Sequence, residues 1–118
     1  MKEILEYTSY RQYIADYYAH KKATSAFTWQ EFASEAGFSS RVYLKYVSEG
    51  RFNLSDVATA RVADAMRLVD YEREYFTEMV QFDHAKTDIE KKAAFNKMLA
   101  IADAHKAKIL EGDSFRFF

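Results

Sequence analysis

The sequence has no cysteine and no proline, and only three of its 118 residues are glycine. Without cysteine the chain can form neither a disulfide nor a thiolate-bound zinc or iron–sulfur centre. Strand-rich folds of this size need many tight turns, where glycine and proline are the usual residues. Their scarcity therefore favours helices joined by short polar connections.

Long apolar runs and a strong net charge are missing as well. No stretch approaches the roughly 18 consecutive apolar residues of a membrane-spanning helix, and the first residues lack the apolar segment of a secretory signal. We therefore expect a cytoplasmic protein with no membrane partner. The net charge of −1 weighs mildly against nucleic acid, because phosphate is bound mainly by lysine and arginine. The acidity is concentrated in residues 55–83, which carry seven acidic and three basic side chains.

Aromatic residues are abundant, with nine tyrosines, ten phenylalanines and one tryptophan. Hydrophobic residues make up 49% of the chain and charged residues 30%, a balance typical of globular proteins and not of disordered ones. A chain of this length can bury a sizeable core, and here much of that core must be aromatic. We expect an all-α protein, a bundle of five or six helices.

Apolar spacing and capping residues predict where these helices lie. A tyrosine-rich stripe predicts a helix over residues 8–22, followed by a loop. Thr28 opens a second helix in a capping-box pattern with Glu31, and Gly37 ends it. Ser39 or Ser40 caps a third helix over residues 39–48.

Three further helices follow in the second half of the chain. Ser55 caps a fourth helix, and Asp70 caps a fifth. Thr87 opens a long sixth helix that runs to about residue 110, where Gly112 closes it. The predicted core consists of residues on the inner faces of these helices: Phe32, Phe38, Leu44, Val47, Val62, Met66, Tyr75, Phe76 and Met79.

Two regions follow from this order of helices. Residues 1–83 would form a helix-turn-helix domain, and residues 84–118 a C-terminal helix and tail that we expect to link to a second domain. Three phenylalanines stand among the last four residues, after a helix with Phe95, Met98, Leu99 and Ala102 on one face. We expect this helix and the tail to form the contact of a homodimer.

Residues 28–54 are the most informative segment for function. They indicate a helix, a glycine turn and a second short helix, the arrangement of a helix-turn-helix. Ala33 provides a small contact between the helices, and Phe38 an apolar plug after the Gly37 turn. A helix advances about 100° per residue. If Leu44 and Val47 face the core, the outward side chains are Val42, Lys45, Tyr46 and Glu49, with Arg41 on the flank.

This pattern resembles the helix-turn-helix of Cro and related repressors, through Phe32-Ala33, Gly37-Phe38-Ser39-Ser40, Tyr43-Leu44-Lys45, Val47, Gly50-Arg51 and Asn53-Leu54. With Glu74-Tyr75-Phe76, Val80-Gln81-Phe82 and Ala85-Lys86-Thr87, nearly the whole chain is similar to the Fibrobacter paralogous family of helix-turn-helix regulators. The resemblance implies the N-terminal part of a bacterial transcription regulator. Gly50 comes one residue later after Gly37 than in the general repressor pattern, so we expect the third helix to be longer or distorted at its end.

We therefore expect double-stranded DNA as the partner, with the recognition helix, residues 39–48, in the major groove. Arginine, lysine and serine can bond base edges, and residues flanking the recognition helix hold phosphates. The predicted base-reading residues are Ser39, Ser40, Arg41, Lys45 and Tyr46, and the predicted phosphate-binding residues are Gln30, Arg51 and Asn53.

Catalysis and metal binding find little support in the sequence. His20, His84 and His105 are far apart and lack the spacing of metal ligands, and no nucleophile or phosphate-loop motif is present. We expect no enzyme activity, no metal and no cofactor. The alternative to DNA binding is a helical protein-interaction domain that retains the helix-turn-helix shape. It is favoured by the balanced charge of residues 27–53, which carry three basic and three acidic side chains.

Overall fold

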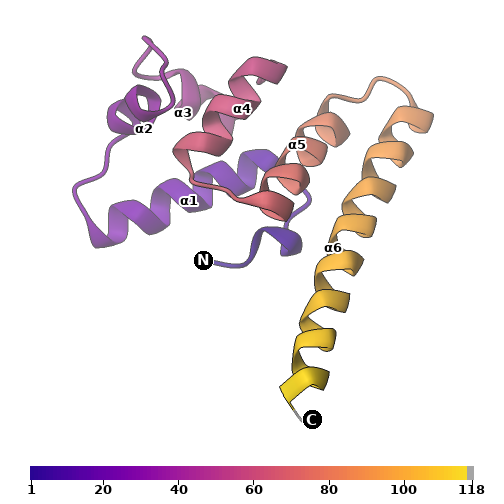
Figure 1. The fold of residues 1–118 in the computed structure, drawn as a ribbon. Helices are drawn as coiled ribbons and strands as arrows, with labels where there is room; N and C mark the ends of the chain where they lie inside the picture. Colours follow the sequence, from indigo (N-terminus) through magenta and orange to yellow (C-terminus); the bar gives the residue numbers. More distant parts are fainter. Residues whose placement is uncertain (117–118) are drawn as a thin grey trace.

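A computed structural model describes residues 1–116, with side chains up to residue 111. The described residues contain no strand, which confirms the expected all-α class (Figure 1). A short 3-10 turn, η1, precedes six α-helices. Their bounds are η1 (Ile4–Glu6), α1 (Tyr10–Thr24), α2 (Trp29–Glu35), α3 (Tyr43–Ser48), α4 (Asp56–Ala65), α5 (Asp70–His84) and α6 (Asp88–Arg116).

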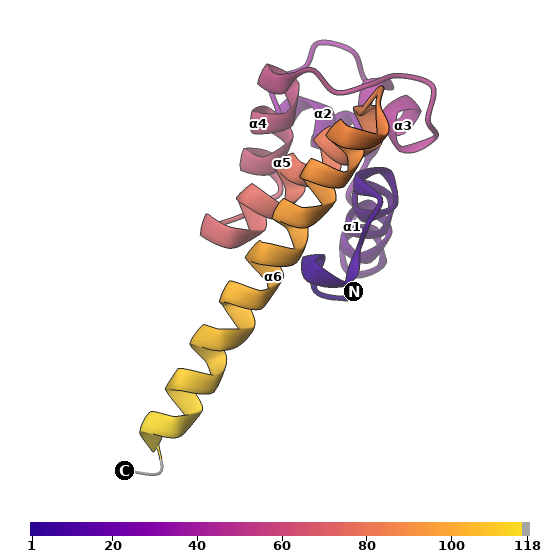
Figure 2. The same cartoon turned by 90° about the vertical axis from the view of Figure 1, so that its right-hand side faces the viewer.

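Helices α3 and α5 both pack against α1 (Figures 1 and 2). Tyr10 and Ile14 on α1 and Phe76 on α5 are fully buried. The ring of Phe76 meets the ring of Tyr10 edge to face at 6.3 Å. Aromatic packing of this kind adds to the hydrophobic stabilisation of the core.

A second group of rings fixes α2 against the far end of α1. Tyr18 stacks on Trp29 with 3.9 Å between ring centroids, and Tyr17 lies 5.2 Å from Phe32. Phe27, in the connection between the helices, contacts both tyrosines. The tyrosine stripe of the first helix is therefore packing surface, as its helical spacing predicted.

The predicted core is confirmed at eight of its nine positions, which are buried. The exception is Phe38, which is half-buried because it follows α2 at the surface and packs on Tyr43 at 4.9 Å. Ile4, Tyr7 and Tyr13 belong to the core although the sequence analysis did not select them.

The predicted capping residues hold at three helices. Side chains of Thr28, Ser55 and Thr87 accept backbone N–H groups three residues ahead, at 3.1 Å each. Gly37 and Gly50 have φ angles of 81° and 84°, a left-handed conformation that glycine adopts without steric cost. They end α2 and α3 as predicted.

Other predicted boundaries were wrong. Helix α3 begins at Tyr43 and not at residue 39, and Val42 precedes it without a side-chain cap, so neither Ser39 nor Ser40 caps it. Asp70 is the first residue of α5 and not its cap. The residue before the helix is Val69, and its backbone N–H donates to the Glu72 carboxylate at 3.3 Å. Helix α6 continues past Gly112 to Arg116, since a glycine inside a helix costs only about 1 kcal/mol and need not end it.

Helix α6 packs beside α5 and then continues beyond the rest of the bundle (Figures 1 and 2). Ala94 and Met98 are its buried residues, whereas Phe95 and Leu99 on the predicted apolar face are 37% and 48% exposed. The phenylalanines of the tail, residues 115–118, lie outside the described side chains. No helix within the described residues is long and apolar enough to cross a membrane.

The buried ring of Phe32 should be critical for stability. We expect Phe32→Ala to lower the free energy of unfolding by about 3–5 kcal/mol, because it empties a fully buried aromatic site. The change is measured by urea denaturation followed by circular dichroism. Ile89→Ala is the control, since Ile89 is 83% exposed and its truncation should change stability by less than about 0.5 kcal/mol. Similar losses in the two variants would contradict the packing described here.

Candidate nucleic-acid interface

Helices α2 and α3 form one unit with a buried inner side and an exposed outer side. Phe32 from α2 and Leu44 and Val47 from α3 are fully buried against the bundle. The predicted site residues lie on the exposed side or in the flanking loops. Those exposed are Gln30, Ser39, Ser40, Arg41, Lys45, Arg51 and Asn53, and Tyr46 is half-buried.

The connection between α2 and α3 is longer than the sequence suggested. It extends from Ala36 to Val42, so that Ser39, Ser40 and Arg41 stand on a loop and only Lys45 and Tyr46 stand on the helix. The expectation of a longer or distorted third helix, drawn from the later position of Gly50, was wrong, because α3 has only six residues and Gly50 ends it in the left-handed conformation. Leu44 and Val47 are buried in the core, while residues 36–42 stay outside both helices.

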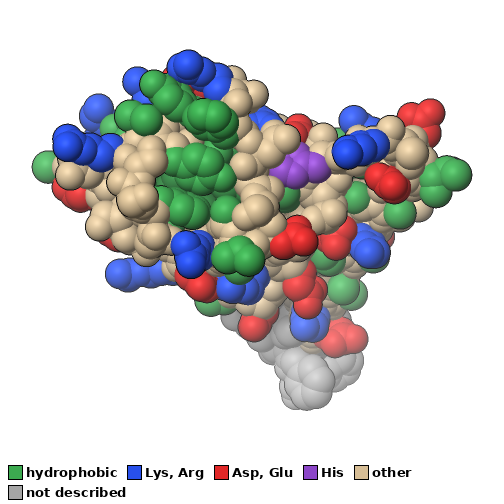
Figure 3. Space-filling model, turned by 90° about the horizontal axis from the view of Figure 1, so that it is seen from above, with side chains coloured by type: hydrophobic (Ala, Val, Ile, Leu, Met, Phe, Trp, Pro, Cys, Tyr) green, Lys and Arg blue, Asp and Glu red, His purple; other side chains and the backbone are tan. Residues whose placement is uncertain are grey.

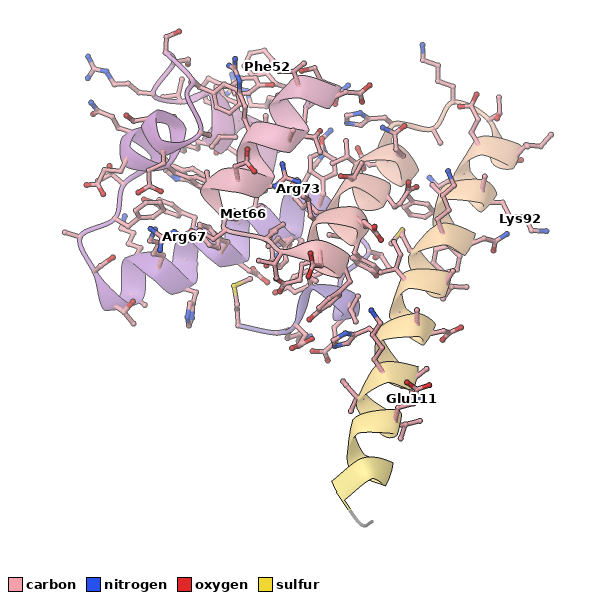
Figure 4. The ribbon with its side chains drawn as sticks, in the orientation of Figure 1. Phe52, Met66, Arg67, Arg73, Lys92 and Glu111 are labelled. Atoms are coloured by element: carbon pink, nitrogen blue, oxygen red, sulfur yellow. The ribbon has the colours of Figure 1, made fainter. Side chains whose placement is uncertain are left out.

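A cluster of aromatic side chains forms the outer surface of α3 and the loop after it. Phe52 lies 6.1 Å from the ring of Tyr43 and 5.8 Å from that of Tyr46. The guanidinium of Arg51 lies over Tyr46 at 4.0 Å from the ring centroid, a cation–π contact. Figure 3 shows apolar side chains gathered over this part of the molecule, with lysine and arginine side chains around them. Figure 4 places Phe52 at the upper edge of the bundle.

Arg11, which the sequence analysis did not select, attaches α3 to the bundle. Its guanidinium donates to the carbonyls of Val47 at 2.7 Å and Phe52 at 2.8 Å, and to Asn53 Oδ1 at 2.6 Å. It also forms an ion pair with Asp83 of α5 at 3.2 Å. These partners lie 36 to 72 residues further along the chain. No local signal could have identified the residue.

Asn53 has a structural role that the sequence did not indicate, while its predicted contact with phosphate stays a prediction. Its side-chain oxygen is already used by Arg11, and its backbone carbonyl accepts the Tyr43 hydroxyl at 2.9 Å. Its side-chain amide N–H₂ is the group still able to donate outward. Asn53 is therefore first a structural residue that holds the loop after α3.

The charged side chains of this surface are weakly engaged. Arg51 pairs with Glu49 at 3.8 Å, with 61% of the arginine side chain exposed. Such solvated pairs contribute little and break readily. Among the described residues, Arg41 and Lys45 take part in no ion pair. Their charges are thus accessible to a ligand.

A partly buried polar contact connects α1 and α5 beside Arg11. The Tyr10 hydroxyl and His84 Nε2 lie 2.9 Å apart, at hydrogen-bond distance. Burial raises the pKa of Tyr10 to about 12. Burial also lowers the pKa of His84, and the Arg11 charge acts in the same direction, while Asp83 opposes the shift. His84 is therefore a neutral ring at neutral pH.

A cleft of about 640 Å³ lies between α4, α5 and α6, and its lining mixes acidic and basic side chains. Arg73, labelled in Figure 4, lines it and pairs with Asp64. Among the side chains that the structure describes, no group of three histidine, aspartate or glutamate residues could hold a metal ion.

Comparison with known proteins adds nothing to this picture. The chain matches no family model, no curated protein and no solved structure. The resemblance to the Fibrobacter paralogous family therefore stays a prediction.

The four contacts of Arg11 should make it a major support of α3. We expect Arg11→Lys to lower the free energy of unfolding by about 1–3 kcal/mol, because an ammonium group cannot reproduce the fork that bonds several acceptors. Urea denaturation measures the change. Arg61→Lys, on the exposed side of α4, should change stability by less than about 0.5 kcal/mol. Equal effects would refute this role of Arg11.

His84 should make stability depend on pH. Its folded pKa lies below the ordinary value of about 6.5, so between these two values the unfolded chain binds the proton more readily. Its contribution is therefore complete above pH 6.5 and is lost as the pH falls towards the folded pKa. Glutamine in His84→Gln keeps a hydrogen-bonding group but does not titrate. The free energy of unfolding of this variant, measured by urea denaturation, should therefore fall less than that of wild type between pH 7.5 and pH 5.5. Parallel pH curves for the two proteins would be the contrary result.

Proposed function

We propose that the chain is the DNA-binding module of a transcription regulator, a helix-turn-helix of the lambda-repressor-like kind. The α2–α3 unit enters the major groove with α3 and the loop that precedes it. The observation that carries the proposal is the arrangement of α3. Its inner residues are fixed in the core, while Arg41 and Lys45 are exposed and held by no ion pair among the described residues.

The exposed residues divide into two roles. Ser39, Ser40, Arg41 and Lys45 would reach base edges, where serine, arginine and lysine have suitable donors. Tyr46 would contribute at the rim, since its ring is partly covered by Arg51. Gln30 at the start of α2 and Arg51 after α3 would hold phosphates, joined by the amide N–H₂ of Asn53.

The proposal includes two copies of the chain and involves no catalytic step, metal or cofactor. A six-residue helix contacts few base pairs, and regulators of this kind bind paired half-sites as dimers. The exposed side chains of α6, among them Leu99, Ile109 and Leu110, provide an apolar surface for that association. The site of action would be the cytoplasm.

One observation favours a second candidate function, a protein-interaction domain. Val42 and Phe52 are 42% and 49% exposed on the same surface that carries the basic residues. The equal numbers of acidic and basic side chains in residues 27–53 weaken attraction to phosphate. A protein with an apolar contact surface would fit this face without needing its charges.

Base-reading and phosphate-holding arginines should behave differently. We expect Arg41→Ala to cost about 1–3 kcal/mol of binding, mainly on a duplex selected from a random library. Arg51→Ala should weaken binding to all duplexes and reduce the slope of affinity against salt by about one unit. Fluorescence anisotropy at low and moderate salt measures both effects.

Lys92→Ala provides the control, because Lys92 is an exposed lysine on α6, on the other side of α5 from Phe52 (Figure 4). It removes the same charge and should leave both affinity and salt slope nearly unchanged. Absence of duplex binding by the wild-type protein at low salt would overturn the proposal. So would unchanged binding after combined loss of Arg41 and Lys45, and the protein-interaction function would then replace it.

A further inference from the structure

An apolar strip crosses the middle of the proposed DNA-binding surface. It consists of Val42 directly before α3, Tyr46 about one turn further on, and Phe52 in the loop after α3. Phe52 contacts the ring of Tyr46 at 5.8 Å. Val42 is 42% exposed and does not belong to the hydrophobic core.

Helical geometry places Val42 and Tyr46 on the side of α3 that faces away from the bundle. With about 100° per residue, Val42, Lys45, Tyr46 and Glu49 fall within an arc of about 100°. The buried residues Leu44 and Val47 lie on the opposite side. The apolar group of Val42 is thus flanked by charged side chains on an outward face.

The chemistry of the major groove includes one apolar group at the base edges, the C5-methyl of thymine. We propose that this surface recognises sites containing thymine, with the Val42 side chain packed against a thymine methyl group. The inference rests on the proposed function and adds to it the class of base that is read. Arg41 and Lys45 at the edge of the strip supply the positive charge that DNA requires, which is why the strip is assigned to DNA.

The contact between Arg51 and Tyr46 restricts which chemical groups of DNA can pack on the apolar strip. The guanidinium of Arg51 covers the Tyr46 ring at 4.0 Å, so this ring has one face occupied and is a poor platform for a stacked base. Val42 carries no polar atom in its side chain. A methyl group entering from the groove can therefore be packed by Val42, whereas a polar base edge at the same place would lose its water without gaining a hydrogen bond.

Replacing thymine by uracil removes only this methyl group and leaves the hydrogen-bonding edge unchanged. A duplex selected by the wild-type protein is changed to deoxyuridine at one thymine at a time, and binding is measured by fluorescence anisotropy. We expect at least one position where uracil weakens wild-type binding about fourfold, the effect of one buried methyl group. In Val42→Ala this ratio should fall to about one.

Val69→Ala is the matched control. Val69 is 58% exposed in the connection after α4, and Arg67, two residues before it, lies at the opposite end of α4 from Phe52 (Figure 4). This variant should keep the fourfold preference for thymine. Circular dichroism of both valine variants verifies that each is folded.

The outcomes separate this inference from the function on which it rests. Three results would overturn the proposed recognition of thymine while leaving DNA binding intact. They are duplex binding that uracil does not weaken at any position, a selected duplex that contains no thymine, and a uracil effect that persists in Val42→Ala. If no duplex binds to the folded wild-type protein, both proposals fail.

Discussion

The position of α3 depends on the hydrogen bonds and the ion pair that the guanidinium of Arg11 makes. A six-residue helix has almost no stability by itself, because nucleation is costly and few hydrogen bonds repay it. Arg11 donates to the Val47 carbonyl within the last turn of α3 and to the Phe52 carbonyl in the loop beyond. A cation at this end of a helix also complements the helix dipole. Asp83 neutralises the same guanidinium, so that α1, α3 and α5 are joined at one point.

This junction connects α3 and the loop after it with α1 and α5. Asp83 is followed by His84, whose ring meets the Tyr10 hydroxyl and lines the cleft between α4, α5 and α6. The proposed recognition surface is thus held by long-range contacts and not by the two helices of the motif alone.

Acidic and basic side chains are distributed unevenly along this nearly neutral chain. The chain as a whole is close to neutral, and residues 55–83 carry most of the acidity. On the outer side of α3 the exposed arginine and lysine stand next to an apolar strip, and the ion pair of Arg51 with Glu49 is solvated and weak. Under the proposed function, the affinity for DNA would come from a few contacts of the exposed arginine and lysine side chains. The acidic side chains of residues 55–83 would be repelled by phosphate and so disfavour other orientations on DNA.

Local sequence signals predict the helical class, three of the capping residues, the glycines that end α2 and α3, and eight of the nine selected core residues. These features depend on interactions within a few residues or on helical periodicity. The tertiary structure was needed to place the start of α3 at Tyr43, because no side-chain cap marks that position and the helix is defined by the packing of Leu44 and Val47 in the core. It also decided the roles of Arg11 and Asn53, whose partners become neighbours only when distant helices pack together.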